Sequence, residues 1–217
     1  MKIYDDIIEK LMQHYSGEKY FQEVQSAKLN FFEFAGLMDE ASPDFEFKMI
    51  QFVEWYLFSR PLKDSGEPPV MHVLQNSDYK IAADEEKYYK NLSQHRHSLF
   101  QLLKISKNDL FIKDLFSDYK LVLRDSDTVM GFNKEELFEA RLIPNEDSFV
   151  FARAYCFHPP QATKFILKEI KKLKKEKFMD PQKREDLILQ LYKMKNKLDQ
   201  YKHVTIDKIY CNDIKAK

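Results

Sequence analysis

The stretch that decides the fold runs from Arg96 to Pro160 and contains the strings FEARLIP (residues 138–144) and AYCFHPP (residues 154–160). Apolar and polar residues alternate along it, whereas the sequence on either side has apolar residues at helical spacing. A period of two is typical of a β-strand whose faces meet different surroundings. The stretch therefore predicts a small sheet inside a mainly helical chain, and the helices must cover that sheet.

Turn residues interrupt the alternation at short intervals, which predicts short antiparallel strands with tight connections. The five expected strands are residues 99–105, 110–115, 119–124, 137–143 and 148–157. This spacing favours a meander or a small, partly open half-barrel.

Helices are expected on both sides of the sheet, because apolar residues recur there every three or four positions. They cover residues 3–14, 19–39, 45–60, 69–76, 84–94, 161–178 and 181–201. The second of them offers five residues to the core: Phe21, Val24, Leu29, Phe32 and Leu37. Ser42-Pro43 and Asp180-Pro181 each place an N-cap before a proline at the first helical position. Residues beyond His203 are expected to form a short strand or to fray.

We therefore expect an α+β protein with N-terminal helices, a five-stranded antiparallel sheet or half-barrel, and a C-terminal helical hairpin. The expected parts are residues 1–95 (helical), 96–160 (β) and 161–217 (a basic hairpin and tail). At 217 residues the chain suits one compact domain with a helical extension, and it is long enough to bury a sizeable core.

Charge is distributed unevenly along the chain, although its formal net charge is zero. Residues 1–61 hold 6 basic and 11 acidic side chains, whereas residues 161–217 hold 16 and 8. The basic tail contains the binding candidates Lys171, Lys172, Lys174 and Lys175. They form either a solvated helix face or a surface for an acidic protein or a nucleic-acid backbone. The basic side chains of the tail are mostly lysines, with no aromatic residues between the four candidates, which argues against base-specific recognition of nucleic acid.

Motifs for common enzyme chemistry are missing from the sequence. Four glycines cannot supply a dinucleotide or P-loop signature, and no zinc-protease or serine-hydrolase motif is present. Two cysteines, Cys156 and Cys211, make neither a disulfide framework nor a four-thiolate zinc site. We expect no cofactor, and we expect a cytoplasmic protein without a membrane segment or a signal peptide.

Four residues in the β stretch or next to it are the candidates for chemistry. His95 and His97 would share one face of a strand and could hold a metal ion with His158, or all three could be ordinary histidines. Arg141 should point to the face opposite Ala140 and Leu142, beside Glu139. There it forms either a solvent-exposed charge pair or an anion site at the sheet edge.

Large side chains crowd the end of the third expected helix, in the run Trp55-Tyr56-Leu57-Phe58. They occupy more than one face of the helix, so they either fill the core between helices and sheet or form an exposed patch for a partner.

Several of these strings together resemble an uncharacterised bacterial family of the deltaproteobacterial type. The strings lie at Phe52–Pro61, Ser98–Phe100, Asp114–Phe116, Phe138–Pro144 and Cys156–Pro159, and the resemblance spans roughly residues 20–175. The central strands are also distantly similar to β modules found beside SEC-C zinc motifs, but this chain lacks the cysteines of that motif. The resemblance implies no catalytic residue.

Three functions follow in order of preference. The first is a non-enzymatic cytoplasmic binding or adaptor protein that uses the lysine-rich hairpin, with a homodimer as one possible assembly. The second is nonspecific association with RNA or ribosomes, which salt would weaken steeply. The third is an enzyme whose site at the sheet edge uses Arg141, Glu139, His97 and His158.

Overall fold

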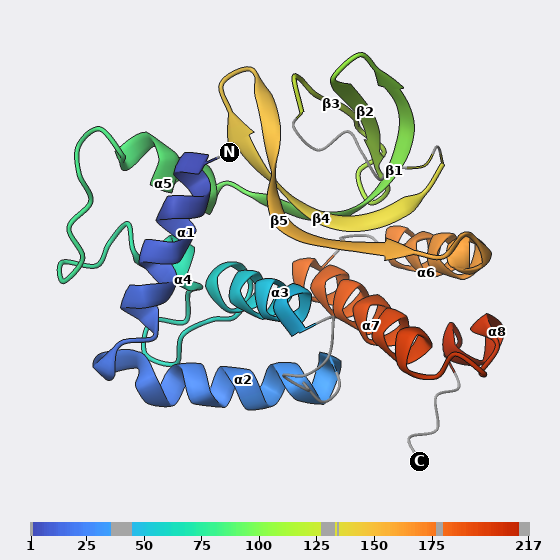
Figure 1. Ribbon diagram of the computed structural model, residues 1–217, viewed down its shortest axis with the longest axis horizontal. Helices are drawn as coiled ribbons and strands as arrows, with labels where there is room; N and C mark the ends of the chain where they lie inside the picture. Colours follow the sequence, from blue (N-terminus) through green and yellow to red (C-terminus); the bar gives the residue numbers. More distant parts are fainter. Residues whose placement is uncertain (1, 36–44, 127–132, 134, 177–179, 213–217) are drawn as a thin grey trace. The chain divides into compact units, whose positions relative to one another are not determined.

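The computed structural model describes residues 2–35, 45–126, 133, 135–176 and 180–212 (Figure 1). Its N-terminal helices are α1 (Lys2–Tyr15), α2 (Phe21–Ala35), α3 (Phe45–Phe58), α4 (Pro69–His72) and α5 (Glu86–Ser93). A short 3₁₀ turn, η1 (Glu18–Tyr20), precedes α2. These helices confirm the expected order, although the N-cap predicted at Ser42 lies outside the described residues.

The sheet has five strands, in agreement with the prediction: β1 (Arg96–Ser106), β2 (Asp109–Asp114), β3 (Lys120–Leu123), β4 (Leu137–Asn145) and β5 (Ser148–His158). Their order in space is β3-β2-β1-β4-β5. The expected meander was therefore wrong in one respect, because β4 is the neighbour of β1 in the sheet and not of β3. Periodicity reports which residues form strands, and it carries no information on this strand order.

Two compact units make up the chain. Unit 1 takes in residues 1–33, 37–96 and 141–154, and unit 2 takes in residues 34–36, 97–140 and 155–217. Strands β4 and β5 contribute to both, because the hairpin at residues 141–154 belongs to unit 1 and the remainder of each strand belongs to unit 2.

Helices α1, α2 and α3 build the core of unit 1, and α2 runs alongside α3 (Figure 1). The ring of Phe31 on α2 lies 5.6 Å from that of Phe52 and 5.4 Å from that of Trp55. The run from Trp55 to Phe58 is buried, so the alternative of an exposed aromatic patch was wrong. Two residues expected in the core, Phe21 and Leu29, are instead 51% and 70% exposed, because α2 buries only one narrow side.

Unit 2 has a second core between the sheet and the C-terminal helices. Helices α6 (Thr163–Lys174), α7 (Pro181–Gln200) and α8 (Ile206–Ile209) follow a short 3₁₀ turn, η2 (Pro160–Ala162). Their apolar side chains form one cluster with Leu99 of β1 and Leu137 of β4. The predicted cap of α7 is confirmed, because the Asp180 side chain accepts the N–H of Gln182 at 2.9 Å. The tail was predicted wrongly, since α8 packs into this cluster and buries Tyr210.

Candidate functional site

Arg141 is buried in unit 1 and does not face solvent as predicted. All residues of β4 from Leu137 to Ile143 are buried, so the strand is covered on both faces. The end of α3 covers Arg141: its Nη2 donates to Ser59 Oγ at 2.8 Å, and its guanidinium carbon lies 5.8 Å from the centre of the Phe58 ring. With 2% of its surface exposed, Arg141 is no anion site on an open sheet edge.

The charge partner of Arg141 is Glu54 of α3, a residue that the sequence analysis did not single out. Glu54 Oε2 lies 3.6 Å from Arg141 Nη1, and both side chains are 2% exposed. Glu54 Oε1 accepts the backbone N–H of Ala154 at 2.7 Å, which ties α3 to β5. The sequence did carry a sign of this role, because Glu54 is the only charged residue between Gln51 and Ser59, and a lone charge among large apolar residues indicates a buried group with a partner.

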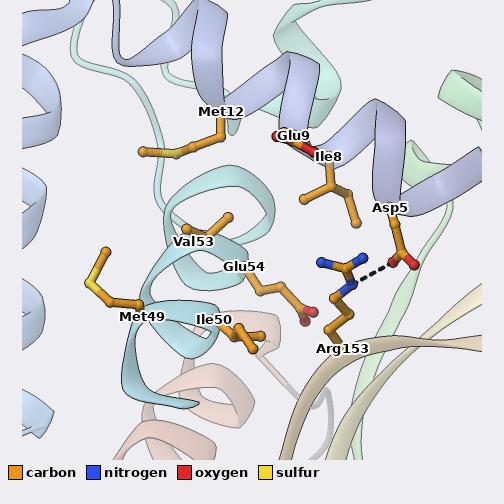
Figure 2. Close-up of a pocket in the computed structure, with 9 residues that line it drawn as sticks. All are labelled: Asp5, Ile8, Glu9, Met12, Met49, Ile50, Val53, Glu54 and Arg153. Atoms are coloured by element: carbon orange, nitrogen blue, oxygen red, sulfur yellow. Dashed lines mark ion pairs between the residues drawn. The ribbon is translucent and has the colours of Figure 1, made fainter. Parts of the chain in front are cut away.

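A groove opens in unit 1 where α1, α3 and β5 meet, and we name it the α1–α3 groove (Figure 2). Its volume is about 340 Å³, within the range of ordinary ligand sites. Apolar side chains form most of its lining: Ile8, Met12, Met49, Ile50 and Val53. Sequence periodicity predicted helices over these residues, and it could not show that α1 and α3 leave a gap between them.

Three charged side chains lie together at one end of the α1–α3 groove, away from Met12 and Met49: Asp5, Glu54 and Arg153 (Figure 2). Arg153 of β5 donates from Nε to Asp5 Oδ1 at 2.9 Å, and Glu54 lies beside this pair. Glu9 also lines the groove and is exposed to solvent. The groove therefore combines an apolar length with three carboxylates and one guanidinium, which suits the binding of an apolar group that carries a charge.

His97 and Glu139 do come together, as the enzyme hypothesis required, but they do so in the interior of unit 2. His97 Nε2 lies 3.0 Å from Glu139 Oε1, and its Nδ1 lies 2.7 Å from Glu185 Oε2 on α7. Each ring nitrogen of His97 therefore lies within hydrogen-bond distance of a carboxylate oxygen, and the ring bridges Glu139 of β4 and Glu185 of α7. The cluster fastens α7 to the sheet, and Glu185 was not anticipated from the sequence.

His158 is also buried, at 2% exposure, and its Nδ1 lies 3.1 Å from the hydroxyl oxygen of Tyr210. Burial, with a smaller effect from Lys195, lowers its pKa to about 3. The thiol of Cys156 on the same strand has a pKa well above its usual value, mainly because of burial and secondarily because of Glu139. Neither side chain is an accessible acid, base or nucleophile at neutral pH.

His95 lies just before β1, in unit 1, with Nδ1 2.9 Å from the carbonyl oxygen of Leu92 and its ring against Phe58. It does not share a strand face with His97, as the metal hypothesis required. Within the described part of the chain, no group of three His, Cys, Asp or Glu side chains is placed to hold a metal ion.

The four candidate lysines lie on α6 or, for Lys175, at its C-cap, and they divide into two kinds. Lys172 bonds Glu169 at 2.7 Å, and Lys174 forms an ion pair with Asp118. Lys171 and Lys175 are exposed, and no described residue forms an ion pair with either. The same holds for Lys164 and Lys168. We name these four exposed residues, Lys164, Lys168, Lys171 and Lys175, the lysine stripe.

Fold and sites together define an α+β protein in which the predicted catalytic candidates Arg141, His97 and His158 are buried, while the groove and the lysine stripe are accessible. The chain belongs to a family of unknown function (DUF7986), whose model matches residues 2–205. A search of the curated proteins and a search of the solved structures gave no match. None of the described helices is long and apolar enough to span a membrane.

Proposed function

We propose that this chain is a non-enzymatic binding protein, an adaptor, whose lysine stripe docks on an acidic surface of a partner protein. The observation that carries the proposal is the exposure of four lysines on one helix without an ion partner among the described residues. Four other lysines of the hairpin form ion pairs within the chain: Lys172, Lys174, Lys183 and Lys195.

The geometry of α6 supports a linear docking surface. Steps of four, three and four residues place the stripe within an arc of about 60° and along about 16 Å of helix. Lysines at these spacings repel one another by a few tenths of a kcal/mol per pair. The last turn of a helix tolerates positive charge, which offsets part of this cost. An acidic partner would relieve the remaining repulsion.

A protein partner is favoured over nucleic acid by the charge of the whole chain. Nonspecific nucleic-acid binders are usually strongly basic, whereas this chain has no net charge and a pI near 7.0. An acidic helix can repeat its carboxylates at the same three- and four-residue spacing, so each lysine can meet one of them. RNA binding remains an outcome that the experiment below distinguishes.

Burial of the catalytic candidates supports binding over catalysis. Arg141, His97 and His158 are 2–3% exposed, and each is bonded to protein groups. A substrate would have to displace those bonds before it reached any of the three. We also propose the cytoplasm as the compartment, because Cys156 and Cys211 are both free thiols. A bacterial origin and the likeness to modules beside SEC-C motifs stay predictions.

The test is capture of partners from lysate by the full-length protein and by Lys168→Glu/Lys171→Glu. Both reversals can form favourable pairs with lysines four residues on, Lys172 and Lys175, so α6 should stay folded. The matched control is Lys202→Glu/Lys208→Glu, which changes the net charge equally at exposed positions of the same unit.

We expect the stripe variant to lose specific partners that the control retains. Equal capture by all three proteins would contradict the proposal. Partners that disappear after ribonuclease treatment would replace it with the RNA alternative.

A further inference from the structure

We propose that the lysine stripe binds the α1–α3 groove of a second copy, so that copies of the chain associate head to tail. This inference rests on the proposed function and names the partner. It comes from the complementary chemistry of the groove in unit 1 and of α6 in unit 2.

The α1–α3 groove can accommodate an apolar side chain with a cation beside it. Five apolar residues line it, and the thioethers of Met12 and Met49 adapt readily to the shape of a guest. Asp5 is bonded to Arg153, and Glu54 to the N–H of Ala154. Glu9 is exposed and has no ion partner among the described residues, so it is the carboxylate at the groove that is open to a new cation.

Helix α6 presents that combination of side chains. Leu167 is 41% exposed at the border of the lysine stripe. Lys164 and Lys171 lie three residues before it and four residues after it, so each is about one helical turn, roughly 5 Å, away along the axis. On the groove side, Glu9 and Met12 are also about one turn apart on α1. A leucine seated beside Met12 therefore brings a lysine to Glu9, in the helix-in-groove mode of recognition.

The charges of the two units favour the same contact. Unit 1 holds 13 basic and 19 acidic side chains, a net charge of −6, whereas unit 2 holds 22 and 16, a net charge of +6. Opposite units of two copies therefore attract each other at low ionic strength, and salt screens this attraction.

The contact joins two different surfaces, so it is heterologous. The copy that binds through its groove still has a free lysine stripe. The copy that binds through its stripe still has a free groove. Association should therefore grow with concentration beyond a dimer, unless the geometry closes a ring.

Sedimentation velocity of the full-length protein at about 20 mM and about 500 mM salt tests the proposal. We expect the weight-average mass to rise with concentration at low salt and to fall to that of the monomer at high salt. Lys168→Glu/Lys171→Glu reverses two of the four stripe lysines, and Glu9→Lys reverses the open carboxylate of the groove, so each variant alone should associate much more weakly than the wild type. Leu167→Ser should weaken association several-fold, whereas Lys202→Glu/Lys208→Glu should leave it unchanged.

Mixing the two defective variants is the decisive measurement. Glu9→Lys keeps an intact stripe, and Lys168→Glu/Lys171→Glu keeps an intact groove, so an equimolar mixture should form hetero-complexes. The proposal is wrong if the wild-type protein is monomeric at 100 µM and low salt, or if the mixture stays monomeric. In either case, capture of partners through the stripe would leave the proposed function standing. If the protein neither captures partners through the stripe nor associates with itself, both proposals are wrong.

Discussion

Replacing Arg141 by methionine should destabilise unit 1 strongly, because it leaves the buried carboxylate of Glu54 without its positively charged partner. Arg141 Nη1 lies 3.6 Å from Glu54 Oε2, and both side chains are 2% exposed. At this separation, an effective dielectric constant of about 20 gives an attraction of about 4 to 5 kcal/mol. Measured losses on removing one partner of a buried pair are similar, about 3 to 5 kcal/mol. We therefore expect Arg141→Met to lower the free energy of unfolding by about 3 to 5 kcal/mol.

The double variant Glu54→Gln/Arg141→Met should recover much of that loss. A neutral glutamine can still accept the N–H of Ala154 through its amide oxygen, while the buried charge is gone. Arg141 Nε has no hydrogen-bond partner among the described residues, so the native pair is itself incompletely satisfied. Apolar replacements of such pairs are often close to neutral. We expect the double variant to regain about 2 to 4 kcal/mol relative to Arg141→Met.

Urea titration followed by tryptophan fluorescence measures both quantities. The chain has a single tryptophan, Trp55, which is buried on α3 next to Glu54 and so reports on the unit that contains Arg141. Free energies follow from the linear dependence on urea concentration. A loss below about 1 kcal/mol in Arg141→Met would refute the reasoning. The double variant would refute it equally if its loss of unfolding free energy equalled the sum of the losses in Arg141→Met and in Glu54→Gln, because the effects of independent sites add.

Two further predictions concern buried groups of unit 2. Burial lowers the pKa of His158 to about 3, below the ordinary value of about 6.5, so the unfolded chain binds the extra proton first and stability is lost as the pH falls from 6.5 towards 3. Between pH 6 and pH 4 the wild type should lose about 1.4 kcal/mol per pH unit more than His158→Gln in urea titrations, and parallel curves would contradict this. The buried thiol of Cys156 should not react with Ellman's reagent in the native protein, whereas the half-buried Cys211 should; two fast-reacting thiols before unfolding would contradict this assignment.

Strand and helix positions could be predicted from the sequence because they depend on local periodicity. The alternation at residues 137–158 marked β4 and β5, and Asp180-Pro181 marked the start of α7 through a cap that forms within three residues. The crossover from β3 to β4 could not be predicted in this way, since it depends on which strand edges are free when the sheet assembles.

Candidate site residues were much harder to place, because the same residue pattern suits an exposed and a buried face. Arg141 alternates with Ala140 and Leu142 as expected, yet α3 covers its face as well. The partner of His97 on α7, Glu185, is 88 residues away in the sequence. No local pattern connects residues so far apart.

By itself, the sequence determined the types and order of the elements, the uneven charge and the absence of familiar catalytic motifs. Tertiary structure alone decided that the arginine and histidines of the β stretch are buried, that α1 and α3 leave a groove, and that only some lysines of α6 are free of partners. Local propensity and periodicity act over one or two turns of chain, whereas burial and ion pairing depend on which distant surfaces meet.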